Sequence, residues 1–374
     1  MIPFFGLDRQ YAELREEILD VTDQVLKSGK VLQGLHVDIF EKAIAARCKR
    51  KFAVAVNSGT QALIFAQTFL NQGADHKILI PNVSYIATLN SVLLSNNTPV
   101  FCDVDYQGQI DLESLPYKFN EYDIKGIMYV NLFGNMVDYE KLTVISKFFN
   151  DVDYIIEDAA QSFGASYKNQ PSGSFGDISI LSFDPTKNLP NYGSGGMLLT
   201  DNFQAYEFFL DMRHNGVYSG NAISGTNSKM SETDCAQMLI KLRHFDKWQQ
   251  RRSKIAAYYM QELYSLIDFE TICIQTVEPN LDVKHAWHKF VIRSTNRNLL
   301  QSFLTSKNIE TKCHYYMPLS DHEVANSYYQ HDLPYSSQFC NQCLSLPIYP
   351  ELTDSEVQHI VDAMKLFHRR RKNF

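Results

Sequence analysis

The sequence lacks the features that would assign it to several large classes of protein. Its 374 residues contain no apolar run close to the ~18 residues that a membrane-spanning helix needs. The first residues show no basic segment followed by an apolar one, so no signal peptide is expected. The seven cysteines are scattered, which favours reduced thiols and a cytoplasmic protein. A net charge of −7 argues against general affinity for nucleic acid or membrane surfaces.

Two local motifs could bind ligands, but each has a simpler explanation. Cys340 and Cys343 form a CxxC with no second pair, which favours two core positions one helical turn apart over a metal or redox site. The basic run at 369–372 favours a solvated helix end over a polyanion site. No G-x-G-x-x-G follows the early strands, which argues against a dinucleotide-binding oxidoreductase. We therefore predict no metal site.

Short apolar segments alternate with helical patterns over the first 250 residues. This alternation predicts an α/β fold, with a mostly parallel mixed sheet flanked by helices on both faces. The predicted helices are 8–28, 37–48, 62–70, 138–149 and one that ends near 96. The predicted strands are 51–56, 77–80, 100–105, 126–132, 154–157, 178–183 and 197–200.

The pattern changes after residue 250, where strands and helices no longer alternate regularly. Helices are predicted at 253–267, 299–306 and 353–368, and strands at 270–275, 287–293 and 311–316. A chain of this length exceeds a single core. We therefore predict a large cofactor-binding domain (1–250) and a smaller C-terminal α+β domain (251–374).

Lys187 is the candidate for covalent chemistry in this sequence. It follows the apolar strand 178–183 after Asp184, Pro185 and Thr186, just past the kind of strand end where open α/β sheets bind ligands. Asp158 ends the preceding predicted strand, and the two strand ends could be neighbours. An aldehyde cofactor with a pyridine ring and a phosphate needs such a pair, because the amine forms a Schiff base and the carboxylate keeps the ring nitrogen protonated.

A turn at 57–61 has the composition of an anion site. Small residues there precede a helix whose free N–H groups and positive dipole end favour a phosphate, although Ser and Thr also cap many helices that bind no ligand. Tyr85 follows the next strand, where its ring could lie against a planar ligand or simply pack on its helix.

Several motifs together carry a resemblance that extends over nearly the whole chain. They are NSGTQAL (57–63), PNVSYIATLNSV (81–92), PVFCDVD (99–105), NLFGNMVD (131–138), IEDAAQSFGA (156–165), GSFGDISILSFDPTKN (173–188), GTNSKMSE (225–232) and LPIYPEL (346–352). The set resembles the DegT/DnrJ/EryC1/StrS family of nucleotide-sugar aminotransferases. That resemblance implies pyridoxal 5'-phosphate as cofactor, the type I (aspartate aminotransferase) fold and a homodimer with shared active sites.

The resemblance also implies a role for each matching residue. Lys187 would bind the cofactor covalently, and Asp158 would pair with its ring nitrogen. Tyr85 and Gln161 would lie against the ring. Phosphate contacts would come from Gly59, Thr60, Gln61 and Ser182, and from Asn227 of the neighbouring subunit.

On the substrate side the sequence departs from the family pattern. Asn131 and Lys229 stand where histidine and arginine are common, and a lysine cannot reproduce the bidentate contact of a guanidinium. Ser320 likewise stands where histidine is usual, whereas His314 and Tyr315 match the pattern. We expect Asn131, Lys229, His314 and Tyr315 to bear on the substrate.

The activity implied is transfer of an amino group from glutamate, releasing 2-oxoglutarate, to a keto group of a dTDP- or UDP-linked deoxy sugar, for lipopolysaccharide or O-antigen biosynthesis. The PTKNL segment (185–189) favours a 3-keto over a 4-keto sugar. Three other functions stay open: a dehydratase with the same cofactor, an enzyme acting on a small amino acid, and an inactive member that serves as a regulator or scaffold. Relatives that act as dehydratases carry histidine in place of the lysine, so Lys187 favours transamination.

Overall fold

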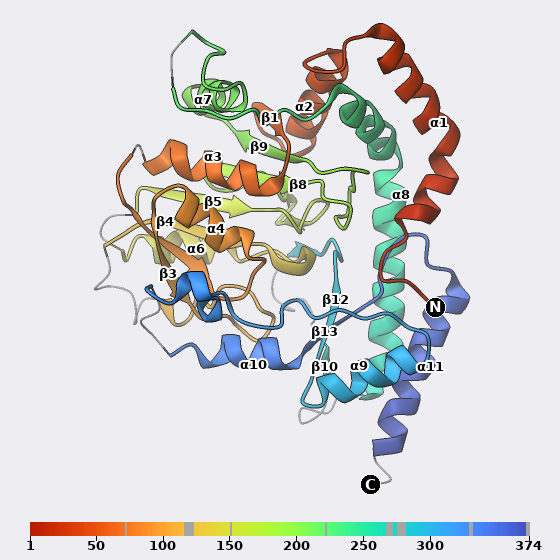
Figure 1. The fold of residues 1–374 in the computed structure, drawn as a ribbon. Coiled ribbons are helices and arrows are strands. Elements are labelled where there is room, and N and C mark those ends of the chain that lie inside the picture. The colour runs from red at the N-terminus through yellow and green to blue at the C-terminus, as the bar shows by residue number, and fades with distance from the viewer. Residues whose placement is uncertain are drawn as a thin grey trace.

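The computed structural model describes residues 1–71, 73–115, 123–149, 152–220, 223–266, 272–274, 282–328 and 332–371. A seven-stranded sheet lies at the centre of its larger part (Figure 1). Strand β9 is antiparallel to both of its neighbours, and the remaining pairs are parallel, so the predicted mostly parallel mixed sheet is confirmed. In spatial order the strands are β1 (Phe52–Val56), β9 (Gly196–Thr200), β8 (Ile178–Ser182), β5 (Tyr154–Asp158), β4 (Ile124–Val130), β2 (Lys77–Pro81) and β3 (Thr98–Cys102).

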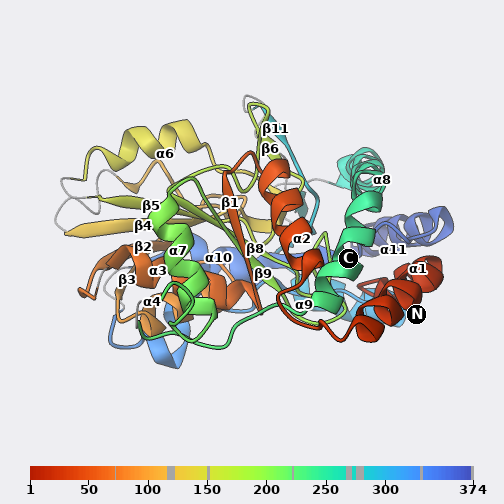
Figure 2. The same ribbon diagram turned by 90° about the horizontal axis from the view of Figure 1, so that it is seen from above.

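Helices cover both faces of this sheet, as the alternation of apolar side chains along the strands requires. In β1, Val54 and Val56 join the core under α3 (Gly59–Asn71), α4 (Ala87–Leu94) and α7 (Phe203–Arg213). Ala53 and Ala55 point to the opposite face and pack with α2 (Leu35–Arg47). Helix α6 (Tyr139–Ser146) lies on that second face over β4 and β2 (Figure 2).

Helix α8 (Glu232–Leu263) spans the two parts of the molecule and is longer than the helix predicted at 253–267, whose last residue lies outside the described residues. Ser231 caps it by accepting a hydrogen bond from Asp234 N–H (2.9 Å). Its first half packs against α2 and against α1 (Leu7–Ser28), whereas Ile255, Tyr259 and Leu263 enter the core of the smaller part. The helix therefore runs without a break through residue 250, where we predict the domain boundary.

The smaller part contains an antiparallel sheet with helices packed against it. The order is β10 (Ile272–Ile274), β12 (Phe290–Ser294), β13 (Cys343–Leu346), and the core includes α9 (Arg297–Ser306) and α11 (Asp354–Arg371). Parts of the strand predicted at 270–275 and of the basic run at 369–372 lie outside the described residues. A third sheet joins β11 (Val283–Lys284), β6 (Ser166–Tyr167) and β7 (Gln170–Pro171). Short 3-10 helices occupy Leu132–Gly134, Tyr264–Leu266, Leu319–Asp321 and Glu323–Ala325.

The strand predicted at 311–316 is wrong. Lys312 forms a single bridge with Ser345, and the chain then leaves the sheet because Leu319 N–H donates to Asn82 O (2.8 Å) beyond β2. Strand β13 takes that place beside β12, and α10 (Pro334–Gln342) precedes it. Cys340 in α10 and Cys343 in β13 are both buried, so both are core residues although they do not share one helical turn.

The N-terminal residues belong to the core of the smaller part. Ile2 forms a parallel bridge with Ile309, and Ile2 N–H donates to Asn308 O (2.7 Å). Ile2 is buried in the same cluster as α9 and α11. This contact brings Phe4 and Phe5 toward the larger part and places Phe5 at a cavity between the two parts.

Candidate active site

A cavity of about 390 Å³ lies where the carboxyl ends of β5 and β8 meet the N-terminus of α3. The parallel pairing of β5 and β8 makes their ends neighbours, as their sequences suggested. The structure brings most of the predicted site residues to this cavity: Gly59, Thr60, Tyr85, Asp158, Gln161, Ser182, Lys187, His314 and Tyr315.

The turn that carries Lys187 is fixed by its own hydrogen bonds. Lys187 N–H donates to Asp184 O (2.9 Å), while Thr186 donates to Asp184 Oδ1 from its N–H and its hydroxyl (2.9 and 2.6 Å). Beyond the lysine, Asn188 Nδ2 donates to Ala286 O (2.8 Å), which anchors the chain to the smaller part. The backbone of Lys187 is therefore fixed at the cavity wall.

Electrostatics around Lys187 favour its neutral form. Burial lowers the pKa of the amine, and the carboxylates of Asp158 and Asp184 partly oppose that shift. A lowered pKa raises the fraction of unprotonated amine, which is the form that attacks an aldehyde or removes a proton.

Asp158 ends β5 with a buried carboxyl group. Ala160 N–H donates to Oδ1 (3.0 Å) and Thr88 Oγ1 donates to Oδ2 (3.5 Å). Burial raises the pKa of Asp158 to about 6, against the opposing effects of the Ala160 N–H, Lys187 and Thr88. A cationic partner in the cavity would restore the charged form.

The start of α3 forms a close-fitting anion site. Ser58 Oγ accepts the N–H of Gln61 (3.1 Å), which leaves the N–H groups of Gly59 and Thr60 without an intrahelical acceptor. A Cβ at Gly59 would lie 2.8 Å from Cβ of Ser182, so only glycine permits this approach of helix and strand. Gly59, Thr60 and Ser182 line the cavity, whereas Gln61 is outside its lining.

Polar contacts also fix the residues expected beside a cofactor ring. Gln161 accepts the N–H of Phe133 (3.1 Å) at Oε1 and donates from Nε2 to the hydroxyl of Tyr315 (3.0 Å), so its amide orientation is determined. The ring of Tyr85 is 55% exposed and its centroid lies 6.2 Å from that of Tyr315. Tyr85 is therefore free to lie against a planar ligand. His314 holds Ser345 Oγ at 2.8 Å through Nδ1.

Besides Gln61, three predicted residues lie away from the cavity lining. Asn131 is buried, and its amide bonds Glu157 Oε1 (2.8 Å) and accepts the N–H of Val137 (2.9 Å), which occupies both ends of the group. Asn227 is exposed and Lys229 is half-buried, on a segment that follows α7. Their roles at a substrate or in a second subunit stay predictions.

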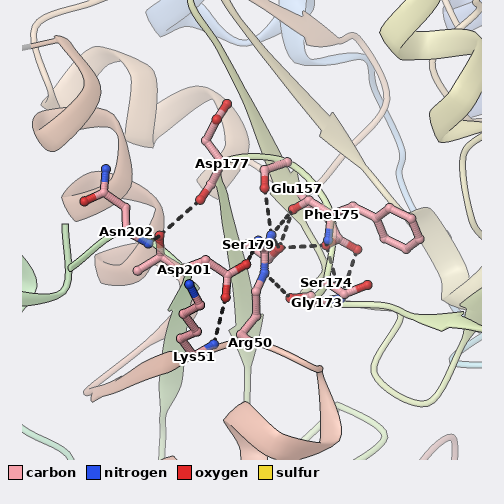
Figure 3. Close-up of polar contacts among 12 residues, drawn as sticks. Arg50, Lys51, Glu157, Gly173, Ser174, Phe175, Asp177, Ser179, Asp201 and Asn202 are labelled. Atoms are coloured by element: carbon pink, nitrogen blue, oxygen red, sulfur yellow. Dashed lines mark hydrogen bonds and ion pairs between the residues drawn. The ribbon is translucent and has the colours of Figure 1, made fainter. Parts of the chain in front are cut away.

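A buried polar network lies beneath the site, and little in the sequence predicts it. Arg50 donates to the carbonyl of Phe175 (2.5 Å) and to Ser179 Oγ (3.0 Å). Glu157 accepts the N–H groups of Gly173 (3.0 Å) and Phe175 (3.0 Å) and the hydroxyl of Ser179 (2.8 Å) (Figure 3). This network holds the loop before β8 against β5, whose last residue is Asp158. The signal available was an acidic residue inside an apolar strand, which must be hydrogen-bonded if buried.

Other lining residues come from parts of the chain that sequence analysis did not connect to the site. They are Phe5 near the N-terminus, Thr88 in α4, and His288, Lys289 and Lys312 in the smaller part. Thr88 lies within the motif at 81–92 but had no role assigned to it, and the other four belong to none of the motifs, so only the folded chain identifies them. Among the described residues no cluster of three or more His, Cys, Asp or Glu side chains could hold a metal ion.

The residues present fit pyridoxal phosphate. Because residue 59 is a glycine, the start of α3 can approach Ser182, where a Cβ would collide with that side chain. The N–H groups at this helix start are then available as donors to a phosphate. Lys187 and Asp158 line the same cavity. Burial lowers the pKa of the Lys187 amine and raises the pKa of the Asp158 carboxyl group. Fold and site together define the class of protein, a pyridoxal-phosphate-dependent aminotransferase with the type I fold.

Comparison with known proteins supports this class. The chain belongs to the DegT/DnrJ/EryC1/StrS aminotransferase family, whose model matches residues 12–365. It is 33% identical to a dTDP-3-amino-3,6-dideoxy-alpha-D-galactopyranose transaminase of Aneurinibacillus thermoaerophilus, over 98% of this chain and 99% of the relative. The crystal structure of S. venezuelae DesV in complex with a ketimine intermediate superimposes with a TM-score of 0.91 at 30% identity, covering 98% of each chain. NtdA from Bacillus subtilis, with bound cofactor PMP, gives 0.88 at 26% identity, over 98% of this chain and 85% of NtdA.

Proposed function

We propose that the protein transfers an amino group from glutamate to the 3-keto group of a dTDP- or UDP-linked deoxy sugar. The observation that carries this proposal is that Lys187, Asp158 and the N-terminus of α3 line one cavity. The name of the relative from A. thermoaerophilus, a dTDP-3-amino sugar transaminase, supports a sugar substrate and position 3. We further propose a role in lipopolysaccharide or O-antigen biosynthesis.

The reaction needs a base, a charge partner and a phosphate anchor, and separate residues would provide them. Bound pyridoxal phosphate supplies an electron-poor ring that stabilises negative charge at the carbon that loses a proton. Lys187 Nζ would take the Cα proton of glutamate and return it to the former aldehyde carbon of the cofactor. The carboxylate of Asp158 would hold a protonated ring nitrogen, and the N–H groups of Gly59 and Thr60 with the hydroxyl of Ser182 would hold the phosphate.

Other assignments complete the proposal. Gln161 and Tyr85 would contact the ring, and His314 and Tyr315 would contact the substrate because they line the cavity. Asn227 would reach the phosphate of the neighbouring subunit in a homodimer, and Gln61, Asn131 and Lys229 stay assigned by resemblance. Within the described ranges no helix has both the length and the apolar character required to cross a bilayer. We propose that the enzyme acts in the cytoplasm.

The test is incubation with glutamate and a panel of 3-keto and 4-keto nucleotide sugars, followed by mass spectrometry of the products. We expect an amino sugar from a 3-keto substrate, with one 2-oxoglutarate released per product. Lys187→Ala should lower that rate at least about a thousandfold, because the base is lost. Wild-type rates in the Lys187→Ala variant would show that Lys187 is not the base.

The panel also separates the alternatives. An amino product from 4-keto sugars alone would make the enzyme a 4-aminotransferase. Loss of water from the sugar without release of 2-oxoglutarate would indicate a dehydratase. Purified protein that neither binds pyridoxal phosphate nor reacts with any sugar would indicate an inactive member of the family.

A further inference from the structure

A pair of lysines in the smaller part lines the same cavity, apart from the anion site at α3. Lys289 directly precedes β12, and Lys312 forms the bridge with Ser345 beside β13. Both ammonium groups lie over the rings of Phe4 and Phe5, at 5.0 and 4.4 Å for Lys289 and at 5.5 and 4.9 Å for Lys312. The two cations therefore share one short piece of cavity wall.

The two lysines differ in their charge partners. Lys312 lies 3.6 Å from a carboxylate oxygen of Glu310, at the limit of an ion pair. Lys289 is only 4% exposed, and within the described part of the chain no carboxylate lies within ion-pair distance of it. Burial and the nearby cations Lys187, Arg252 and Lys312 lower the pKa of Lys289 well below its usual value, and Asp184 opposes this only in part.

A buried lysine in this position is unfavourable unless something compensates it. An isolated ammonium loses hydration on burial, and the faces of two phenylalanine rings return only part of that loss. A methionine or leucine would fill the same space without the electrostatic penalty. An anion that enters the cavity would supply the negative charge that would pair with Lys289.

We propose that Lys289 and Lys312 together bind an anionic oxygen group of a substrate, a carboxylate or a phosphate, inside the active-site cavity. This proposal rests on the proposed function, because it takes the cavity as the place of reaction. The cofactor phosphate has its own donors at Gly59, Thr60 and Ser182, on other elements. The anion held by the lysines is therefore a second one, either a carboxylate of the amino donor, the diphosphate of the nucleotide or a carboxylate on the sugar.

The experiment compares cofactor-loaded wild type with Lys289→Met, Lys312→Met and the conservative Lys289→Arg. Calorimetry measures the binding of glutarate, of UDP and dTDP, and of UDP-glucuronate against UDP-glucose. We expect Lys289→Met to weaken at least one of these anions about tenfold or more, since a hydrogen bond to a charged group is lost. Lys312→Met should weaken the same anion, and Lys289→Arg should retain most of the affinity. The probe affected identifies the source of the anion.

Two further measurements distinguish the loss of an anion contact from a general loss of structure. Lys307→Met is the matched control, because its ammonium also lies over a ring (Phe303, 5.6 Å) but outside the cavity lining, and it should change no affinity. Thermal unfolding of Lys289→Met should occur at the wild-type temperature or above it, because the unfavourable buried charge is gone.

Affinities within twofold of wild type for every probe in a folded Lys289→Met protein would overturn the proposal. Binding requires no turnover, so failure of all sugars to react would count against the proposed function and not against the lysine pair.

Discussion

At the scale of single residues, Asp158 shows how a group that we propose for catalysis can oppose stability. Its carboxyl is buried and has two hydrogen-bond donors, yet its pKa is raised to about 6 from the ordinary 3.8. Above pH 6 the ligand-free protein therefore holds a carboxylate that would be better solvated in the unfolded chain. A protonated pyridine nitrogen would be a suitable partner for this carboxylate.

Replacing Asp158 by asparagine should stabilise the cofactor-free protein at neutral pH while abolishing useful activity. The native state keeps the Asp158 proton up to about pH 6, whereas the unfolded state loses it near 3.8, so wild-type stability falls as pH rises through that window. Asparagine has no such penalty, and the gain at pH 7.5 should reach up to roughly 3 kcal/mol. Thermal unfolding of both proteins between pH 4.5 and 7.5 measures it.

The difference between Asp158→Asn and wild type should shrink as pH falls, because both side chains are then neutral. A difference that does not change with pH, or a variant that is less stable than wild type at pH 7.5, would contradict this account of Asp158. Activity with glutamate should fall by orders of magnitude at every pH, because an amide cannot keep the ring nitrogen protonated.

At the scale of elements, the last two residues of β5 point to opposite faces of the sheet. Asp158 faces the cavity, while Glu157 is turned to the buried network with Arg50 shown in Figure 3. Both oxygens of Glu157 accept from N–H or O–H groups, among them Gly173 N–H and Ser179 Oγ. The network therefore fixes the end of β5 to the loop before β8, directly beside the site.

Glu157→Gln should destabilise the protein strongly. Either orientation of the new amide turns an NH₂ group toward donors that now bind a carboxylate oxygen, such as the N–H groups of Gly173 and Phe175. Leaving buried donors unpaired should lower the free energy of unfolding by about 2–4 kcal/mol, measured by urea denaturation. Glu140→Gln is the control, because that glutamate pairs with Lys168 on the surface and should cost at most about 1 kcal/mol. Equal losses of unfolding free energy in the two variants would contradict the stabilising role of the network around Glu157.

The elements differ in how far the sequence could predict them. Strands β5 and β8 are short apolar runs buried on both faces, and the acid and the lysine that follow them could be assigned to one crevice from the α/β pattern. The segment 311–316 resembles a strand because it contains a threonine and two tyrosines, but only Lys312 bridges to a strand, at Ser345, and the chain that follows is held by Asn82 at Leu319. Lys289 appeared as one polar residue within a predicted strand, and its burial depends on Phe4 and Phe5, distant in sequence. Tertiary contacts of this kind have no local sequence signal.

At the scale of the whole molecule, Asn227 is the predicted site residue that bears on assembly. It is exposed, outside the cavity lining, on a segment whose neighbours bridge to α7 and β1 (His214 with Asn227, Val56 with Lys229). An exposed position is what a contact with a second subunit requires. Homodimers are commonly symmetric, so such a contact would be made twice, once at each site.

Mixing two defective variants tests whether sites are shared. In a dimer of one Lys187→Ala chain and one Asn227→Ala chain, one site would carry both defects and the other would have Lys187 from one chain and Asn227 from its partner. Random exchange makes about half of the dimers mixed, so activity should recover to about a quarter of wild type at limiting cofactor. Each variant alone should stay well below that level. The control is Lys187→Ala mixed with the double variant, which offers no intact site. If Asn227 serves only its own chain, the first mixture should gain nothing over Asn227→Ala by itself, and cofactor retained after gel filtration should follow the same order.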